Sequence, residues 1–268
     1  MSLTYTELDE RIHQLCQTIA KANRTFVTPK EDDSHTNLAF DSTSQRIYGR
    51  WISRISGSVI LALNLKTWTF EWLDESLDVL LSVDIANKYQ KDVEQEINSQ
   101  LREMDLLKEG FAGPLHFDIP KYEFAEEKIT IPEQEVLRRW IELRGLANQV
   151  SHDFLDVLQQ TTEVRIWPHH FDTGIYVEKH ERMGYGFGWA MKDSMIGEPY
   201  YYLSGYALRG ELNYSKLSEL DFGFWKQTEH WKGAVLPLET FDNVSIVQAR
   251  SLILSFSESV FKAISRQH

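Results

Sequence analysis

The sequence predicts an α+β protein in which mainly antiparallel sheets pack against helices on one side. Short strand patterns follow one another as hairpins, and in one of them Trp68, Phe70 and Trp72 alternate with polar residues, as in a half-buried strand. Long stretches with helical spacing of apolar residues flank these strands. The same order of elements occurs in the first and second halves of the chain, which indicates an internal duplication.

The first helix is expected to begin at a capping box. Thr4 and Glu7 have the spacing of that motif, and the helical pattern continues for about five turns to Asn23. Cys16 lies among the apolar positions of this helix, so we expect a core thiol rather than a nucleophile. Because it is the only cysteine, the chain forms no intramolecular disulfide, which fits a reducing compartment.

Strands dominate the next part of the first half. Two hairpins are expected, then a long helix and a connector rich in glycine and proline. The ranges are Thr36–Asp41 with Gln45–Ile52, Ser58–Leu65 with Thr67–Leu73, a helix over Ser76–Lys108, and a connector over 109–132 with a short strand at Leu115–Phe117. The start of the helix is open, since Val79-Leu80-Leu81 could also belong to a strand or to a separate short helix.

The second half repeats this succession of helix, strands and helix. The expected elements are a helix over Glu133–Gln160, strands at 165–178, Tyr185–Met191, Tyr200–Tyr206 and Ala234–Pro237, and a closing helix from Asn243 to Ser265, with residues 207–231 less regular. In the proposed duplication Phe40-Asp41 matches Phe171-Asp172. The predicted organisation is a first α/β half over 1–108, a connector over 109–132 and a second α/β half over 133–268.

Composition restricts the partners. The 268 residues carry a formal charge of −12 and give a pI near 5.2, so nucleic acid and anionic membranes, which repel an acidic surface, are not expected. No stretch approaches the roughly 20 uninterrupted apolar residues that span a bilayer. The N-terminus lacks the pattern of a signal peptide, so we expect a cytoplasmic protein whose partner is a small molecule.

The stretch Arg165–Glu178 contains the main candidates for chemistry. If it forms one strand, alternation places His170 and Asp172 on one face and His169 on the other. An aspartate beside a histidine can orient it for acid–base catalysis, so His170 and Asp172 are the candidate catalytic residues. No Gly-x-Ser-x-Gly, His-Glu-x-x-His or phosphate-loop motif accompanies them.

The same pair suits a divalent metal, since imidazole and carboxylate are common ligands of zinc, iron and manganese. Two ligands do not complete a site. A third would come from one of four residues: Glu178, His180, His35 or Glu198.

Aromatic and polar residues further along the second half are candidates for ligand binding. They are His169, Trp189, Glu198, Tyr200 and Tyr202, with His35 and Asp41 as weaker counterparts in the first half. Each has an alternative structural role: a histidine on an apolar face is commonly a hydrogen-bonded core residue, and aromatic stripes at period two are commonly core.

Several segments resemble an uncharacterised bacterial family of unknown function. They are Trp167-Pro168-His169-His170-Phe171-Asp172, Gly186-Phe187-Gly188-Trp189, Glu198-Pro199-Tyr200-Tyr201-Tyr202 and Ala234-Val235-Leu236-Pro237. The resemblance covers residues 133–268 well and the first half loosely. It implies a soluble bacterial protein and no particular reaction.

Three functions therefore follow from the sequence. The preferred one is a small-molecule-binding protein with its pocket around 166–178. The alternatives are an enzyme that uses His170 and Asp172, with or without a divalent metal, and a structural or interaction protein whose motif strand is core.

Overall fold

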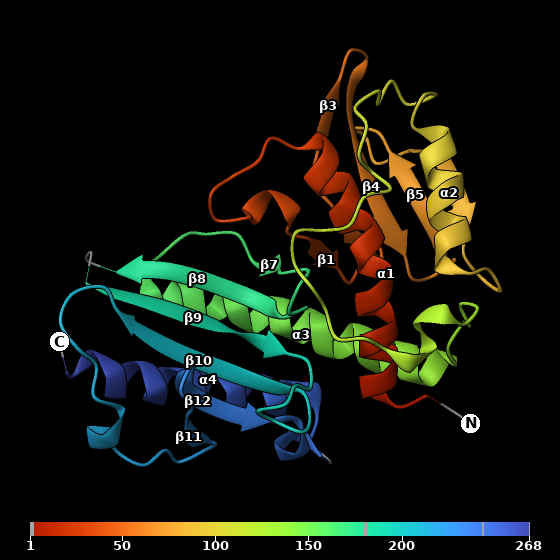
Figure 1. Ribbon diagram of the computed structural model, residues 1–268. Coiled ribbons are helices and arrows are strands. Elements are labelled where there is room, and N and C mark those ends of the chain that lie inside the picture. The colour runs from red at the N-terminus through yellow and green to blue at the C-terminus, as the bar shows by residue number, and fades with distance from the viewer. Residues whose placement is uncertain (1–2, 180–181, 243, 268) are drawn as a thin grey trace. The chain divides into compact units, whose positions relative to one another are not determined.

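The computed structural model describes residues 3–179, 182–242 and 244–267. In these ranges the chain forms four α-helices and two antiparallel sheets, which confirms the predicted α+β class (Figure 1). No helix of the described ranges is long and apolar enough to cross a membrane.

The chain divides into two compact units whose boundaries differ from the predicted halves. The first unit comprises 1–141 and 166–171, and the second comprises 142–165 and 172–268. The predicted connector over 109–132 therefore belongs to the first unit. The helix α3 (Gln134–Leu158) contains the boundary, and the chain returns briefly to the first unit over 166–171.

Helix α1 (Tyr5–Phe26) begins at the predicted capping box. The Glu7 N–H donates to Thr4 Oγ1 at 3.2 Å, and the Thr4 N–H donates to Glu7 Oε2 at 2.7 Å. The helix ends at Phe26, one turn later than predicted. Cys16 is fully buried in its apolar stripe, as the sequence predicts for a core thiol.

The first sheet contains both predicted hairpins. Its strands are β1 (Ala39–Asp41), β2 (Arg46–Tyr48), β3 (Ile52–Arg54), β4 (Gly57–Asn64), β5 (Thr69–Leu73) and β6 (Val79–Asp84). Their order is β1-β2-β4-β5-β6, with β3 paired to β4. Helix α1 packs on β3 and β4. The sheet forms an antiparallel meander around the buried aromatic rings Phe70 and Trp72.

Two local predictions for the first unit are wrong. The helix expected over Ser76–Lys108 is confined to α2 (Gln90–Gln100), and its uncertain start, where a strand was the alternative, forms β6. Residues 79–84 pair with β5, and this tertiary pairing overrides the helical spacing; Asn87, with φ 60°, separates strand from helix. No strand forms at Leu115–Phe117; the connector contains a 3-10 turn, Glu123–Glu126, and one isolated bridge from Lys128 to Tyr89.

The second unit is a sheet with helices on one side. Its elements are β7 (Arg165–Ile166), β8 (Thr173–Lys179), β9 (Met183–Ala190), β10 (Tyr200–Ala207), β11 (Phe224–Gln227), β12 (Lys232–Pro237) and α4 (Ile246–Ser265). The order is β11-β12-β10-β9-β8-β7. Figure 1 shows residues 142–158 of α3 and all of α4 behind this sheet. Within the described residues of the second unit, no α-helix covers the opposite face of the sheet.

Most of these elements were expected, and β11 was not. It is a short edge strand whose residues Trp225 and Lys226 are only partly buried, so it lacks the apolar run of a central strand. Helix α4 begins at a capping box formed by Ser245 and Gln248. Gly205 on β10 permits its close approach, since a Cβ there would lie 3.0 Å from the Ile264 side chain.

The structure does not confirm the internal duplication. The two sheets have different strand orders. Phe40-Asp41 lies in a hairpin strand, whereas Phe171 has a left-handed backbone (φ 57°) outside any strand. The two Phe-Asp pairs therefore occupy unlike positions.

Candidate ligand-binding face

The stretch 165–178 is not one strand, so the predicted alternation across it is wrong. Strand β7 ends at Ile166, residues 168–170 form a turn, and β8 begins at Thr173. Pro168 cannot donate to a strand ladder, and the Phe171 N–H donates back to Trp167 O at 2.6 Å. His170 and Asp172 both precede β8, so they do not share a strand face as predicted, and the boundary between the two units falls between Phe171 and Asp172.

The turn is held to the first unit by a buried histidine that sequence reasoning missed. His13 on α1 is fully buried; its Nε2 lies 2.8 Å from Pro168 O and its Nδ1 lies 2.7 Å from the Tyr122 hydroxyl. A carbonyl oxygen only accepts, so Nε2 carries the proton, and Nδ1 accepts from the Tyr122 hydroxyl. The His13 ring also stacks on Phe171 at 5.1 Å. His13 thus anchors the backbone of the Trp-Pro-His-His motif at Pro168 to the core of the first unit.

His169 and His170 lie side by side on the first unit. Their ring centroids are 4.2 Å apart, His169 is half-buried against Phe117, and His170 is exposed. Burial is the main cause that lowers the pKa of His169 to about 4; nearby His170 and His116 lower it further, and Asp33 opposes them. Near pH 7 the His169 ring is therefore neutral.

We expect the protein to lose stability on acidification from pH 6.5 to pH 4, in part through His169. The unfolded chain binds a proton at this residue near pH 6.5, whereas the folded chain binds it only near pH 4. The unfolded state thus holds more protons in this window, and stability falls as pH falls. After a discount for the exposed part of the ring, His169→Gln should remove about 1 kcal/mol of this loss.

Urea unfolding at pH 7 and pH 4.5 measures the effect. His152→Gln, which changes an exposed histidine on α3, is the matched control and should retain the wild-type pH dependence. An unaltered pH dependence in His169→Gln would contradict the assignment.

His35 and Asp41, the weaker candidates, have local structural roles in the first unit. His35 is buried, and its Nδ1 accepts from the Lys30 N–H at 3.2 Å. Burial alone would raise the pKa of Asp41, but hydrogen bonds from Ser44 and Thr43 lower it overall. Asp41 thereby caps the turn between β1 and β2.

In the second unit, Trp189 and Tyr202 lie on opposite faces of the sheet. Trp189 is fully buried on the helix side, 4.7 Å from the Tyr201 ring, and Tyr201 packs edge-on against Phe241. Glu198 accepts from the Glu239 N–H at 2.8 Å and so caps the turn after β12. Trp189 therefore belongs to the core, and Glu198 has a structural partner.

The helix-free face brings together Tyr200, Tyr202 and Asp172. The Tyr202 hydroxyl donates to Asp172 Oδ2, and the Tyr200 hydroxyl donates to Asp193 Oδ2 at 2.8 Å. Burial raises the pKa of both phenols, and the neighbouring carboxylates raise it further. Both hydroxyls therefore stay protonated as donors at every physiological pH.

Two further tyrosines on this face were missed. Tyr176 on β8 and Tyr206 on β10 are each 42% exposed, and their ring centroids are 6.1 Å apart. Glycines of β9 allow these rings to lie over the strand: a Cβ at Gly184 would meet the Tyr176 hydroxyl at 2.4 Å, and one at Gly186 would meet the Tyr206 ring at 3.4 Å. The spacing of glycines 184, 186 and 188 was the sequence signal for this close approach.

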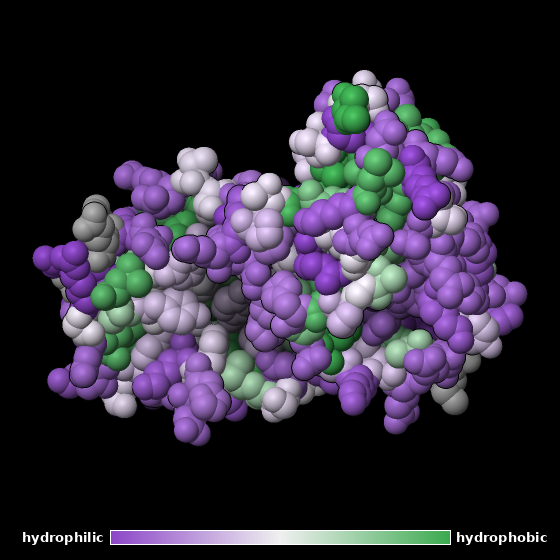
Figure 2. Space-filling view, turned by 45° about the horizontal axis from the view of Figure 1, so that its top comes forward, coloured by the Kyte–Doolittle hydropathy of each residue, from purple (hydrophilic) through white to green (hydrophobic). Residues whose placement is uncertain are grey.

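Tyr206 also borders a hollow at the end of the sheet. With Trp231 it lines a space of about 310 Å³, which lies in the range of small-molecule sites. The other lining residues are Gly205, Ala207, Leu212, Tyr214, Glu229, His230 and Lys232. In Figure 2, white and pale lilac side chains of intermediate hydropathy gather in the left part of the view, where Figure 1 places β8, β9 and β10. We call the face formed by Tyr176, Tyr200, Tyr202, Tyr206 and Trp231 the tyrosine face.

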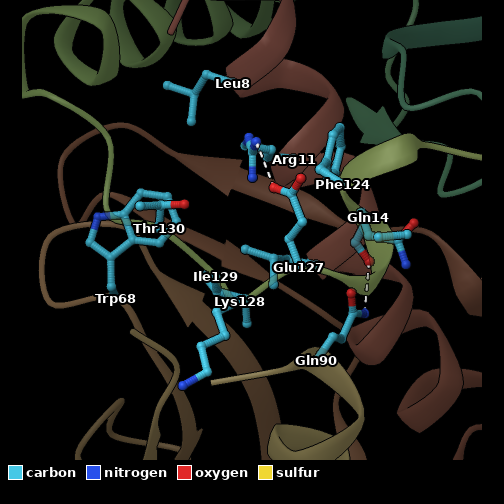
Figure 3. Close-up of a pocket in the computed structure, with 12 residues that line it drawn as sticks. Leu8, Arg11, Gln14, Trp68, Gln90, Phe124, Glu127, Lys128, Ile129 and Thr130 are labelled. Carbon is cyan, nitrogen blue, oxygen red and sulfur yellow. Dashed lines mark hydrogen bonds and ion pairs between the residues drawn. The ribbon is translucent and has the colours of Figure 1, made fainter. Parts of the chain in front are cut away.

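A second crevice lies within the first unit and is too small for an organic ligand. Arg11 points toward Glu127, 3.6 Å away, and lies over the Phe124 ring, while Gln90 bonds the backbone of Gln14 (Figure 3). The space between them is about 30 Å³, room for a water molecule or two.

The described residues contain no group of three or more His, Cys, Asp or Glu side chains arranged to hold a metal ion. His180, one of the predicted third ligands, lies outside the described residues, and His35 lies in the other unit from Asp172. The geometry therefore lends the divalent-metal hypothesis no support.

Comparison with known proteins gave no assignment: no family model, no curated protein and no solved structure matches this chain.

Proposed function

We propose that this protein binds a small organic molecule on the tyrosine face of its second unit. One observation carries the proposal: two half-exposed phenol rings, Tyr176 and Tyr206, lie 6.1 Å apart on the helix-free side of the sheet, next to a hollow of about 310 Å³. Rigid aromatic rings provide a large contact area at low entropic cost, which suits the recognition of a flat or compact ligand.

The supports around these rings favour a preformed site. Tyr202 and Tyr200 are anchored by hydrogen bonds to carboxylates, and Trp231 stands at 81° to the Tyr202 ring with its centroid 6.4 Å away. The Trp231 N–H donates to Thr228 Oγ1 at 2.9 Å, which orders the backbone of the loop that carries this ring. A ligand would pay little to order such a surface.

The proposed ligand site differs from the sequence prediction in its members. Asp172, Tyr200 and Tyr202 are retained, whereas His169 and His170 lie on the turn of the first unit, Trp189 is buried on the helix side and Glu198 caps a turn. No arrangement of the described residues specifically favours the enzyme hypothesis over binding.

A thermal-shift screen tests the proposal. Wild-type protein and the double variant Tyr176→Ala/Tyr206→Ala would be screened against organic ammonium ions, sugars and nucleosides. A ligand at ten times its Kd should raise the Tm of the wild type by about 3 °C and leave that of the double variant unchanged.

Tyr89→Ala is the matched control, since Tyr89 is an exposed tyrosine of the first unit. It should respond like the wild type. If no compound stabilises the wild type, or if the double variant responds equally, the tyrosine face is not a binding site. That result would support the alternative of a structural or interaction protein.

A further inference from the structure

Carboxylates lie beside three of the hydroxyl groups of the tyrosine face and give it negative charge. Tyr176 donates to Glu178 at 3.3 Å, Tyr200 to Asp193 at 2.8 Å, and Tyr202 to Asp172. Three phenols on one face thus each pair with a carboxylate. The rings remain neutral, because burial and the adjacent carboxylates raise the pKa of all three phenols.

Such pairing makes the rings more attractive to cations. A phenol whose proton is shared with a carboxylate has more electron density in its ring, so the negative potential above the ring face grows. The carboxylates beside the phenols add their own negative potential; at the adjoining hollow Glu229 and Lys232 offset one another. The net charge of −12 strengthens the same preference.

The rings also form corners instead of parallel stacks. Tyr176 and Tyr206, each 42% exposed, are tilted by 58°, and Tyr202 and Trp231 by 81°. Tyr200, tilted by 61° to Tyr202, is buried and supports the Tyr202 ring from within the protein. A corner of rings surrounds a compact, roughly spherical group on more than one side, whereas a flat ligand is best held between parallel rings. Aromatic corners of this kind suit a methylated ammonium group.

Basic residues mark the limit of this region. By register Lys226 on β11 lies opposite Gly233 and so faces the helix-free side, two strands from β10. Lys232 is the residue before Gly233 on β12, so by register its side chain starts from the opposite, helix-covered face. The cation-attracting area is therefore bounded on the β11 side and centred on β8 to β10.

From these charges and angles we infer that the ligand of the tyrosine face is a small organic cation with an alkylated ammonium group. This inference rests on the proposed function and names its ligand class. A bulky ammonium group is weakly hydrated, so it exchanges water for ring faces at low cost, and the nearby carboxylates balance its charge without direct contact.

Titration calorimetry with a matched pair of probes tests the charge. Choline and 3,3-dimethylbutan-1-ol have nearly the same shape, and only choline is charged. Choline should bind at least about tenfold more tightly than the neutral alcohol, a difference of about 1.4 kcal/mol. Equal affinity for both probes, or preference for the alcohol, would overturn the inference while leaving a binding site on the tyrosine face.

Variants at Glu178 and Tyr206, each with a control, test whether choline binds on the tyrosine face. Glu178→Gln removes an exposed carboxylate beside Tyr176 and should weaken choline binding about threefold, whereas Glu258→Gln, an equal charge change on α4, should not. Tyr206→Leu keeps apolar area but removes the ring, and should weaken choline about tenfold, while Tyr206→Phe retains binding.

The outcomes separate the two proposals. If sugars or nucleosides stabilise the wild type and choline does not bind at 50 mM, the ligand class is wrong and the site stands. If choline binding is insensitive to Tyr206→Leu, choline binds elsewhere and the inference fails. The proposed function fails separately, if the Tyr176→Ala/Tyr206→Ala variant responds to every stabilising compound as the wild type does.

Discussion

Gly174→Ala is expected to destabilise the second unit by about 3 kcal/mol or more, the largest effect of any single change discussed here. A Cβ at this position would lie 2.2 Å from Phe187 O and 2.7 Å from Gly188 Cα. Both are backbone atoms of the neighbouring strand, so no rotamer change can relieve the contact. Strands β8 and β9 would have to separate at this pair.

Gly186→Ala is the matched comparison on the same face. Its added methyl group would lie 3.4 Å from the Tyr206 ring, an ordinary contact with a side chain that can move. The cost should stay below about 1 kcal/mol, since alanine also restricts the unfolded chain.

Urea unfolding followed by circular dichroism compares the two variants, and the soluble yield of Gly174→Ala gives a second measure if it fails to fold. Similar stabilities for the two alanine variants would show that the Gly174–Gly188 pairing is looser than the structure indicates.

His13→Leu is expected to destabilise the protein by about 2–4 kcal/mol. The change removes both ring hydrogen bonds, those with Tyr122 and Pro168, from a fully buried position, and each buried polar group left without its partner costs about 1–3 kcal/mol. The leucine keeps most of the apolar volume, and Gln17 still donates to Pro168 O at 2.8 Å, which limits the loss.

Urea unfolding at pH 7 measures this loss against two comparisons. Tyr122→Phe breaks only the Nδ1 bond and should cost less than half as much. His152→Leu, at an exposed position of α3, should change stability by less than about 0.5 kcal/mol. A His13→Leu variant as stable as the wild type would remove the structural explanation of the Trp-Pro-His-His motif.

Local signals in the sequence predicted local structure well. The Thr4–Glu7 capping box, the hairpin around Ser42 and the strand of alternating glycine and aromatic residues in β9 were all identified, because each depends on neighbours within a few residues. The stretch 79–84 could not be decided for the opposite reason. Its residues fit a strand or a helix, and the pairing with β5 that decides between them involves residues outside the segment.

The candidate site was predicted in part. Tyr200 and Tyr202 were chosen correctly as members of one face, and Asp172 meets Tyr202 there. Trp189 was grouped with them, although alternation around Gly188 puts it on the helix side. The sequence could not show which face of the sheet the helices cover, since that depends on contacts between distant segments such as Phe154 and Phe187.

The first unit cannot fold completely until the segment 166–171, which lies late in the chain, has been synthesised. Leu38 pairs with Ile166, and His13 bonds Pro168, across about 130 and 155 residues of sequence. During synthesis at roughly 5–20 residues per second, α1 and the first sheet must wait many seconds for these partners. Over that interval the His13 ring lacks its carbonyl acceptor, and a nascent chain stalled before residue 166 should be markedly more sensitive to protease than one released after residue 171.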